Sequence, residues 1–398
     1  MEHAEFSPWP DYGQEEIELV SSVLRSGKVN YWTGNEARDF EREFAKYSNT
    51  RYAVAVANGS VALELALRAL EIGSGDEVIV SPRSFIASAS CIANIGAKPV
   101  FADVDYDTQN ISAKSIEPLL TRDTKAIICV HLAGWPCDMN SIMSLAEYHG
   151  LKVIEDCAQA HGGVYKGQPV GSLGHVAAFS FCQDKIMTTG GEGGMLTTND
   201  AHVWEKAWAY KDHGKSYSAV YEQSHPPGFR WLHESFGTNW RLTEMQAAIG
   251  RFQLRKMQSW HQERTENAMS IAQACRPFVA KGVLRAPDPP DDIEHAYYRF
   301  YVFIEPDSLR PGWNRDKIVS EINARGVPCF QGSCSEVYLE KAFDNTGFRP
   351  TRRLAVAKKL GETSLTFLVH PTLSKAEIDR TCNAIEEIFT VATTSFKK

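Results

Sequence analysis

Residues 151–198 read LKVIEDCAQAHGGVYKGQPVGSLGHVAAFSFCQDKIMTTGGEGGMLTT, and the rest of the chain can be interpreted outward from them. The stretch opens with an apolar run typical of a buried strand, which ends in Glu155 and Asp156. A second apolar run comes before Lys185, and a glycine cluster leads into a last β-like run at 195–198. An acid at the end of a buried strand and a lysine on a nearby loop indicate a site for a covalently bound cofactor.

Strand-like and helix-like segments alternate from residue 52 to residue 198. Apolar strands separated by helical patterns of about 10 to 15 residues predict an α/β fold, with a parallel sheet covered by helices on both faces. Such sheets bind ligands at the carboxyl ends of their strands, where Gly59, Asp156 and Lys185 all fall. The predicted strands are 52–57, 77–81, 99–105, 125–134, 151–156, 177–181 and 195–198, and the predicted helices are 61–72, 84–96, 112–120 and 138–148.

The segments on either side of this alternation have other patterns. Residues 13–26 have the spacing of an amphipathic helix with Gly27 as its stop, and a polar helix is expected near 36–48. Residues 215–239 are rich in aromatic residues, proline and glycine, which is typical of a long functional loop or lid. One continuous helix is expected over 242–274, where the chain leaves the first domain.

The remaining residues alternate again and predict a second, smaller α+β domain. We therefore expect a large α/β cofactor-binding domain over residues 1–250, which includes the N-terminal helical segment, and a small C-terminal α+β domain over residues 251–398. The expected strands of the small domain are 298–305, 327–330 and 364–368, and its expected helices are 314–326, 352–361 and 375–389.

Composition argues against several classes of protein. A formal net charge of −7 disfavours nucleic acid or an anionic membrane as the main partner. No apolar run approaches the roughly 20 residues that a membrane-spanning helix requires, and the first residues lack the pattern of an export signal. The 9 cysteines include no C-x-x-C pair, so neither a metal site nor a disulfide framework is expected. These features predict a cytoplasmic protein.

Two side chains of the opening stretch carry the predicted chemistry. A lysine in an apolar pocket loses its proton more readily and attacks carbonyl groups, although Lys185 can also be a solvated loop lysine. Asp156 can cap a helix or form an ion pair. A carboxylate at the end of a strand can also keep the pyridine nitrogen of a bound cofactor protonated. That protonation lets pyridoxal phosphate act as an electron sink, so the two residues are those that this cofactor most needs.

The phosphate of such a cofactor requires hydrogen-bond donors. Gly59 and Ser60 stand where a strand turns into a helix, so backbone N–H groups and the helix dipole face an anion there. Ser60 can equally be an ordinary N-cap, a role compatible with phosphate binding. Ser180 adds a hydroxyl group. Phe85 can cover one face of a bound ring, although by itself it fits a core position at least as well.

These segments together resemble a known family. Nearly the whole chain, from SGKVNYWTGNEARDFEREFA to the closing helix, is similar to the DegT/DnrJ/EryC1/StrS family of pyridoxal-phosphate sugar aminotransferases. The resemblance implies fold type I of the aspartate aminotransferase superfamily, in which a mainly parallel sheet flanked by helices is followed by a small α+β domain. The motifs that carry the resemblance are VANGSVALELAL, GSGDEVIVSPRSFIASA, VIEDCAQAHGGVYKGQPVGSLG, FSFCQDKIMTTGGEGG and GTNWRLTEMQAAIG.

The resemblance also implies roles for individual residues. Lys185 is similar to the lysine that forms a Schiff base with the cofactor and then carries a proton between substrate and cofactor. Asp156 resembles the partner of the pyridine nitrogen, Gln159 the residue near the cofactor O3′, and Phe85 the ring-stacking aromatic. Asn239 matches a residue that the neighbouring subunit contributes, which implies a homodimer with shared active sites. The residues that match the phosphate site are Gly59, Ser60, Ser180 and Asn239.

Members of this family aminate a nucleotide-linked keto-sugar at C3 or C4, usually with glutamate as donor, for O-antigen, capsule or other glycans. Thr33 and Gln331 are expected to contact the substrate. Arg241 can bind an anionic group of the substrate and can equally form a structural ion pair. Cys182 stands where many members have a histidine, and the loop at 215–239 is longer than usual. Because these places face substrate in the family, the identity of the sugar stays open.

Two other functions are compatible with the sequence. One is amination of a cyclic ketone that carries no nucleotide, such as an inosose or an antibiotic precursor. The other is a non-catalytic protein that binds pyridoxal phosphate and acts as a regulator; it predicts loss of the lysine or the aspartate, and both Lys185 and Asp156 are present. A subgroup with histidine in place of the lysine dehydrates its substrate, and Lys185 disfavours that reaction.

Overall fold

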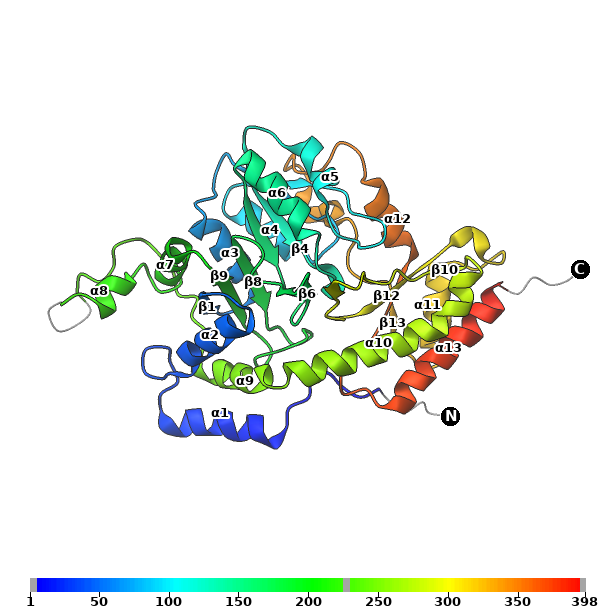
Figure 1. Cartoon of the computed structure of the whole chain (residues 1–398), viewed down its shortest axis with the longest axis horizontal. Coiled ribbons are helices and arrows are strands. Elements are labelled where there is room, and N and C mark those ends of the chain that lie inside the picture. Colours follow the sequence, from blue (N-terminus) through cyan, green and yellow to red (C-terminus); the bar gives the residue numbers. More distant parts are fainter. Residues whose placement is uncertain (1–5, 225–229, 394–398) are drawn as a thin grey trace, which may run out of the picture.

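The computed structural model describes residues 6–224 and 230–393, which contain a seven-stranded sheet (Figure 1). The strand order is β1-β9-β8-β5-β4-β2-β3, and all neighbours are parallel except β9, which runs antiparallel to β1 and β8. The predicted α/β fold with a mainly parallel sheet is confirmed. The strands are β1 (Tyr52–Val56), β2 (Glu77–Val80), β3 (Lys98–Phe101), β4 (Thr124–Val130), β5 (Lys152–Asp156), β8 (Val176–Ser180) and β9 (Gly194–Thr198).

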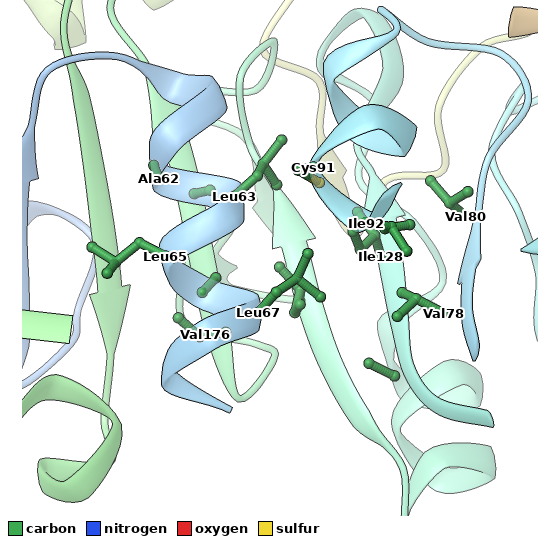
Figure 2. Close-up of a cluster of buried hydrophobic side chains, with 14 of the residues drawn as sticks. Ala62, Leu63, Leu65, Leu67, Val78, Val80, Cys91, Ile92, Ile128 and Val176 are labelled. Carbon is green, nitrogen blue, oxygen red and sulfur yellow. The ribbon is translucent and has the colours of Figure 1, made fainter. Parts of the chain in front are cut away.

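Alternate residues of the central strands pack on opposite faces of this sheet. Val78 and Val80 of β2 belong to a core with helix α3 (Gly59–Ala69), whereas Ile79 between them belongs to a core with α6 (Met139–His149). Because such strands are covered on both sides, their sequences are continuous apolar runs rather than alternating ones. Figure 2 shows part of the first of these cores, with Leu63, Leu65 and Leu67 on α3 and with Val78, Val80, Ile128 and Val176 on the strands.

The N-terminal helices pack against a helix from the middle of the chain. Helices α1 (Gln14–Ser26) and α2 (Glu36–Tyr47) both contact α9 (Glu244–Leu254). The predicted helix over 13–26 is confirmed, and it ends as expected at Gly27, which has left-handed backbone geometry.

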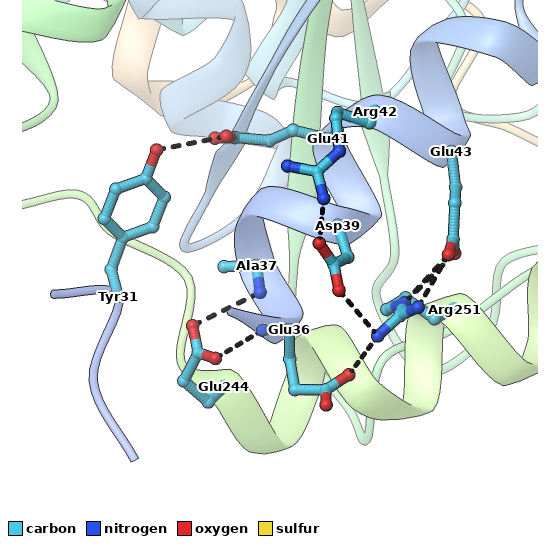
Figure 3. A network of polar contacts seen from close by, with 9 residues as sticks. All are labelled: Tyr31, Glu36, Ala37, Asp39, Glu41, Arg42, Glu43, Glu244 and Arg251. Carbon is cyan, nitrogen blue, oxygen red and sulfur yellow. Dashed lines mark hydrogen bonds and ion pairs between the residues drawn. The ribbon is translucent and has the colours of Figure 1, made fainter. Parts of the chain in front are cut away.

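A polar network joins α2 to α9 (Figure 3). The Glu244 carboxylate accepts hydrogen bonds from the backbone N–H groups of Glu36 and Ala37, at the positive end of α2. Arg251 forms an ion pair with Glu43 at 2.7 Å and contacts Glu36 as well. The network fixes α2 against α9.

The single helix expected over 242–274 is wrong, because α9 and α10 (Met257–Ala280) are separate helices. Between them Lys256 N–H bonds the carbonyl of Gln253, a tighter bond than that of an α-helix. α9 packs on α2, whereas Ile271 and Phe278 of α10 belong to a different apolar core that also contains the small sheet. The two helices therefore serve different packing partners, and no glycine or proline marks the break.

A second sheet of four antiparallel strands follows α10, in the order β10-β12-β14-β13. Helices cover it and share its core, as the predicted small α+β domain requires. The proposed division after residue 250 stays a prediction. The elements are β10 (Leu284–Arg285), β12 (Phe300–Ile304), β13 (Cys329–Phe330), β14 (Ser364–Phe367), α11 (Arg315–Asn323), α12 (Ala355–Thr363) and α13 (Lys375–Thr393).

The segment 215–239, expected to be loop throughout, contains a short helix, α8 (Tyr217–Tyr221). It forms because Tyr217 and Tyr221 pack their rings against Trp208, and residues 225–229 lie outside the described part. Within the described ranges, no helix is both long and apolar enough to cross a membrane. The other elements are α4 (Ala87–Asn94), α5 (Ala113–Ile116), α7 (Ala201–Tyr210), β6 (Val164–Tyr165), β7 (Gln168–Pro169) and β11 (Ile293–Glu294).

Candidate active site

A cavity of about 890 Å³ lies at the carboxyl ends of the large sheet's strands. Its wall includes Gly59, three residues beyond β1, and the last residues of β5 and β8, Asp156 and Ser180. This is the edge at which α/β sheets bind ligands. The part of the chain that contains the small sheet contributes the opposite wall, with Tyr298, Arg299, Tyr301, Phe330, Gly332, Ser333, Cys334 and Thr366.

Lys185 enters this cavity from the loop after β8, and its side chain is 15% exposed. Its Nζ atom lies 3.2 Å from the Asp184 carboxylate and 5.3 Å from the centroid of the Tyr298 ring. Burial tends to raise the pKa of Asp184, but the Lys185 ammonium and the Tyr298 hydroxyl outweigh it and hold that pKa below its usual value. The indole N–H of Trp9 bonds the Lys185 carbonyl at 2.8 Å, which ties the loop to the N-terminal segment.

Asp156 ends β5 with a carboxylate that is only 4% exposed. One of its oxygens accepts a hydrogen bond from the Ser88 hydroxyl at 2.7 Å, and the other accepts from the Ala158 N–H at 3.1 Å. Burial raises the pKa of Asp156, and the bond from Ser88 opposes that rise because it stabilises the ionised form. The carboxylate is thus held in one orientation at the cavity wall.

Ser88 is in turn bonded to a second hydroxyl. Its Oγ lies 2.8 Å from Oγ of Ser84, and the backbone N–H of Ser84 donates to the Cys334 carbonyl at 3.1 Å. The chain Cys334–Ser84–Ser88–Asp156 therefore connects the small-sheet part of the protein to the carboxylate at the end of β5. Sequence analysis did not single out Ser88.

The N-terminus of α3 meets the end of β8 at Gly59 and Ser180. A Cβ atom on Gly59 would lie 2.5 Å from Cβ of Ser180, so no side chain fits between these two segments. Ser60, the next residue, lines the cavity and is exposed. Backbone N–H groups in the first turn of a helix lack intrahelical partners and bind anions. This corner of the cavity therefore suits a phosphate group.

The chain was compared with known proteins. Residues 10–386 match the DegT/DnrJ/EryC1/StrS aminotransferase family. The chain belongs to this family. The predicted family and fold type I are confirmed, and with them an aminotransferase that depends on pyridoxal phosphate.

Individual relatives of this DegT/DnrJ/EryC1/StrS aminotransferase match along nearly their whole length. GDP-perosamine synthase of Escherichia coli O157:H7 is 34% identical over 380 residues, which cover 96% of this chain and 97% of that protein. The solved aminotransferase from Psychrobacter cryohalolentis is 62% identical, with a TM-score of 0.97 and coverage of 98% of this chain and 100% of that one. The PLP form of Spr1654 from Streptococcus pneumoniae is 27% identical, with a TM-score of 0.86 and coverage of 98% and 100%.

The cavity of this DegT/DnrJ/EryC1/StrS aminotransferase fits pyridoxal phosphate. The buried Asp156 carboxylate suits a protonated pyridine nitrogen, and the absence of a side chain on Gly59 leaves room beside Ser180. Phe85 presents a ring that is 68% exposed, and Gln159 accepts a hydrogen bond from the Ala133 N–H at 2.8 Å. The predicted residues that line the cavity are Gly59, Ser60, Phe85, Asp156, Gln159, Ser180 and Lys185.

Four predicted residues do not line this cavity: Thr33, Asn239, Arg241 and Gln331. Arg241 forms the ion pair that the sequence left open, with Asp212 at 2.5 Å. Gln331 bonds Asp316 at 2.9 Å, although its neighbours on both sides line the cavity. Thr33 and Asn239 are exposed. The contact of Thr33 with substrate stays a prediction, and so does the contact of Asn239 with the cofactor phosphate bound in a second subunit.

A buried cluster beneath the site offers metal-ligand atoms. His131, Glu155 and Cys157 lie within reach of one ion. However, His131 Nε2 is 3.0 Å from a Glu155 oxygen, and its Nδ1 accepts from the Cys137 N–H at 3.0 Å. The Glu155 carboxylate also accepts the N–H of Gly171 at 2.9 Å. His131 and Glu155 thus have hydrogen-bond partners within the protein, and through Gly171 the Glu155 carboxylate holds the loop after β7.

The small-sheet wall of the cavity escaped sequence analysis. Tyr298, Arg299 and Phe330 line it, yet they lie more than a hundred residues after Lys185 in sequence. Nothing in their local pattern distinguishes them from residues of an ordinary half-buried strand. Ser88 had a weak signal, because it lies three residues after Phe85 in a helical segment and so shares a helix face with it.

Proposed function

We propose that this aminotransferase converts a nucleotide-linked keto-sugar to the corresponding amino sugar, at C3 or C4. The observation that carries the proposal is that Lys185, Asp156 and the Gly59 corner line one cavity of about 890 Å³. Ligand cavities commonly measure about 300–1,000 Å³, so this one has the size for a cofactor with a sugar beside it. The substrate class is supported by the relative named GDP-perosamine synthase.

Pyridoxal phosphate supplies an electron sink when it is bound. In the proposed site Asp156 holds the proton on the pyridine nitrogen, and Ser88 keeps that carboxylate ionised and oriented. Lys185 binds the cofactor covalently and, once released, moves a proton at the reacting substrate carbon. Phe85 covers one face of the ring, and Gln159 lies beside the ring hydroxyl O3′.

The phosphate is proposed to sit at the N-terminus of α3. Gly59 and Ser60 offer backbone N–H groups there, and Ser180 offers its hydroxyl. Asn239 is exposed and outside its own chain's cavity, so it is free to reach the phosphate of a second subunit in a homodimer. Thr33 and Gln331 are proposed to contact the substrate at the rim.

The reaction is proposed to run in two halves. With pyridoxal phosphate held by Lys185 and Asp156, an amino donor, glutamate, would give up its amino group in the first half, and the keto-sugar would receive it in the second. We propose that the enzyme acts in the cytoplasm and that its amino-sugar product is used to build O-antigen or another surface polysaccharide. Both halves use one cavity, so the donor and the sugar must both fit against the wall that carries Tyr298 and Phe330.

The test is covalent attachment of the cofactor followed by amino transfer. We expect borohydride reduction of the loaded protein to place the cofactor mass on the peptide that contains Lys185, and Lys185→Ala to lose it. Lys166→Ala, which removes an exposed lysine elsewhere, should leave the attachment unchanged. Wild type but not Lys185→Ala should then aminate one of a panel of nucleotide-linked 3- and 4-keto-sugars with glutamate.

Other results would change the assignment. A protein that aminates an inosose but none of the nucleotide sugars would be an aminotransferase of free cyclic ketones. Attachment at Lys185 without transfer from any donor would favour a regulator. Attachment at a different lysine would remove Lys185 from the mechanism.

A further inference from the structure

The cavity has an unusual balance of charge. Among the described residues that line it, Lys185 and Arg299 are the basic ones, and the acidic ones are Glu64, Asp156, Asp184 and Glu192. Both substrates of the proposed reaction carry negative charge, so each needs a cation. Lys185 is committed to the cofactor and lies beside Asp184. Arg299 is therefore the cation that remains for a substrate anion.

The guanidinium of Arg299 lies beside two aromatic rings that line this cavity. Its Cζ atom is 5.3 Å from the centroid of the Tyr298 ring and 5.7 Å from that of Phe330. Both rings line the large cavity, and neither lines the cavity of about 220 Å³ that Arg299 also borders. Two aromatic rings thus hold the guanidinium where a ligand in the large cavity can reach it.

No acidic group among residues 6–224 and 230–393 forms an ion pair with Arg299. Two of the acids that line the cavity have other partners: Glu64 pairs with Arg68 at 2.7 Å, and Asp184 contacts Lys185. The same region contains the buried Arg264, whose pKa is lowered to about 9 by burial and by the charge of Arg299. Two arginines without a counter-ion leave this wall electropositive, as an anion site requires.

We propose that Arg299 binds the α-carboxylate of the amino donor, an inference that rests on the proposed transaminase function. Arg299 and Lys185 face one ring, because Nζ of Lys185 and Cζ of Arg299 each lie 5.3 Å from the centroid of Tyr298. An α-carboxylate is bonded to the carbon that carries the amine, so a donor reacting beside Lys185 has its carboxylate close by. The planar guanidinium matches a carboxylate with two parallel hydrogen bonds.

The pyrophosphate of a nucleotide sugar is a less suitable occupant. It is attached at C1 of the sugar, which is two ring bonds from C3 and three from C4, whereas the donor carboxylate is bonded directly to the reacting carbon. When C3 or C4 lies beside Lys185, the pyrophosphate therefore lies further from Arg299 than the donor carboxylate does. The donor, rather than the sugar nucleotide, is therefore the ligand whose binding depends on Arg299.

The test uses calorimetric titration of the cofactor-loaded protein with glutarate, a dicarboxylate that has no amine, and with UDP. We expect Arg299→Gln to weaken glutarate binding at least about tenfold, the scale of one lost charge-assisted pair, and to leave UDP binding unchanged. Arg299→Lys keeps the charge without the planar fork and should fall between. Arg276→Gln removes an exposed arginine that does not line the large cavity and should match wild type.

Three outcomes would overturn the proposal: wild type that binds no glutarate, Arg299→Gln that binds it as wild type does, or a loss confined to UDP. The last outcome would assign Arg299 to the pyrophosphate instead. A melting temperature close to wild type for Arg299→Lys shows that the fold is intact. Glutarate binding that depends on Arg299, without amino transfer from any donor, would keep the anion site and refute the transaminase.

Discussion

Replacing Ser88 by alanine removes the side-chain hydrogen bond to Asp156. The bond is 2.7 Å long, joins a hydroxyl to a carboxylate, and is buried. Hydrogen bonds to charged groups contribute about 1.5–3 kcal/mol to stability. The substitution also leaves the Ser84 hydroxyl without its 2.8 Å partner. We expect the free energy of unfolding of the cofactor-free protein to fall by about 1.5–3 kcal/mol at pH 8.

The loss should depend on pH with a definite sign. Burial raises the pKa of Asp156 in the folded state, and Ser88, His131 and Lys185 oppose that rise. A raised pKa means that protonated Asp156 favours folding at low pH, and this contribution is lost as pH rises through the folded-state pKa. Ser88 offsets part of that loss, because its O–H bond stabilises the ionised form. The effect of Ser88→Ala should therefore be full at pH 8 and shrink as the pH falls through the folded-state pKa.

Urea unfolding of the cofactor-free protein at pH 8 and at pH 4.5 measures this difference. Ser88→Thr keeps a hydroxyl at the same place and should recover most of the stability at pH 8. Ser90→Ala, in the same helix and cavity wall, removes a hydroxyl that has no hydrogen-bond partner among residues 6–224 and 230–393, and it is the matched control. A Ser88→Ala variant as stable as wild type at pH 8, or equally destabilised at both pH values, would refute the reasoning.

Two further substitutions test the geometry of the site. Gly59→Ala places Cβ 2.5 Å from Cβ of Ser180. We therefore expect titration of this variant to show that it binds pyridoxal phosphate at least about tenfold more weakly than wild type. In Gly73→Ala the added Cβ has no atom of the described residues within 4 Å, so this control variant should bind the cofactor as wild type does. Equal affinity in both variants would contradict the close approach. Trp9→Phe keeps a ring but loses the donor to the Lys185 carbonyl, and thermal unfolding should show a loss of about 0.5–1.5 kcal/mol. An unchanged melting temperature would mean that this bond does not hold the loop.

The strands could be predicted because burial on both faces leaves a local signature. Val78, Ile79 and Val80 are all apolar because both faces of β2 are buried: Val78 and Val80 share a core with residues of α4, and Ile79 shares a core with residues of α6. Helix ends were also readable, since the side chain of Asp138 caps α6 and glycine ends α1. These features depend on residues close in sequence.

Features that depend on distant partners were not predicted. The break between α9 and α10 has no glycine or proline; α9 packs on α2, whereas Ile271 and Phe278 of α10 pack in the core of the small sheet. The helix α8 forms in a loop-like composition because Tyr217 and Tyr221 find Trp208. In both places tertiary packing outweighs local propensity.

The sequence by itself determined which chemical groups stand at the active edge of the sheet. Asp156 ends a strand, Gly59 and Lys185 each come shortly after one, and parallel connections bring such positions to one edge whatever the packing details. The tertiary structure alone decided what surrounds them. Ser88 bonds Asp156 across 68 positions of the sequence, and Arg299 joins the cavity from the small-sheet wall. No local pattern records such contacts, because they arise only when separate elements pack together.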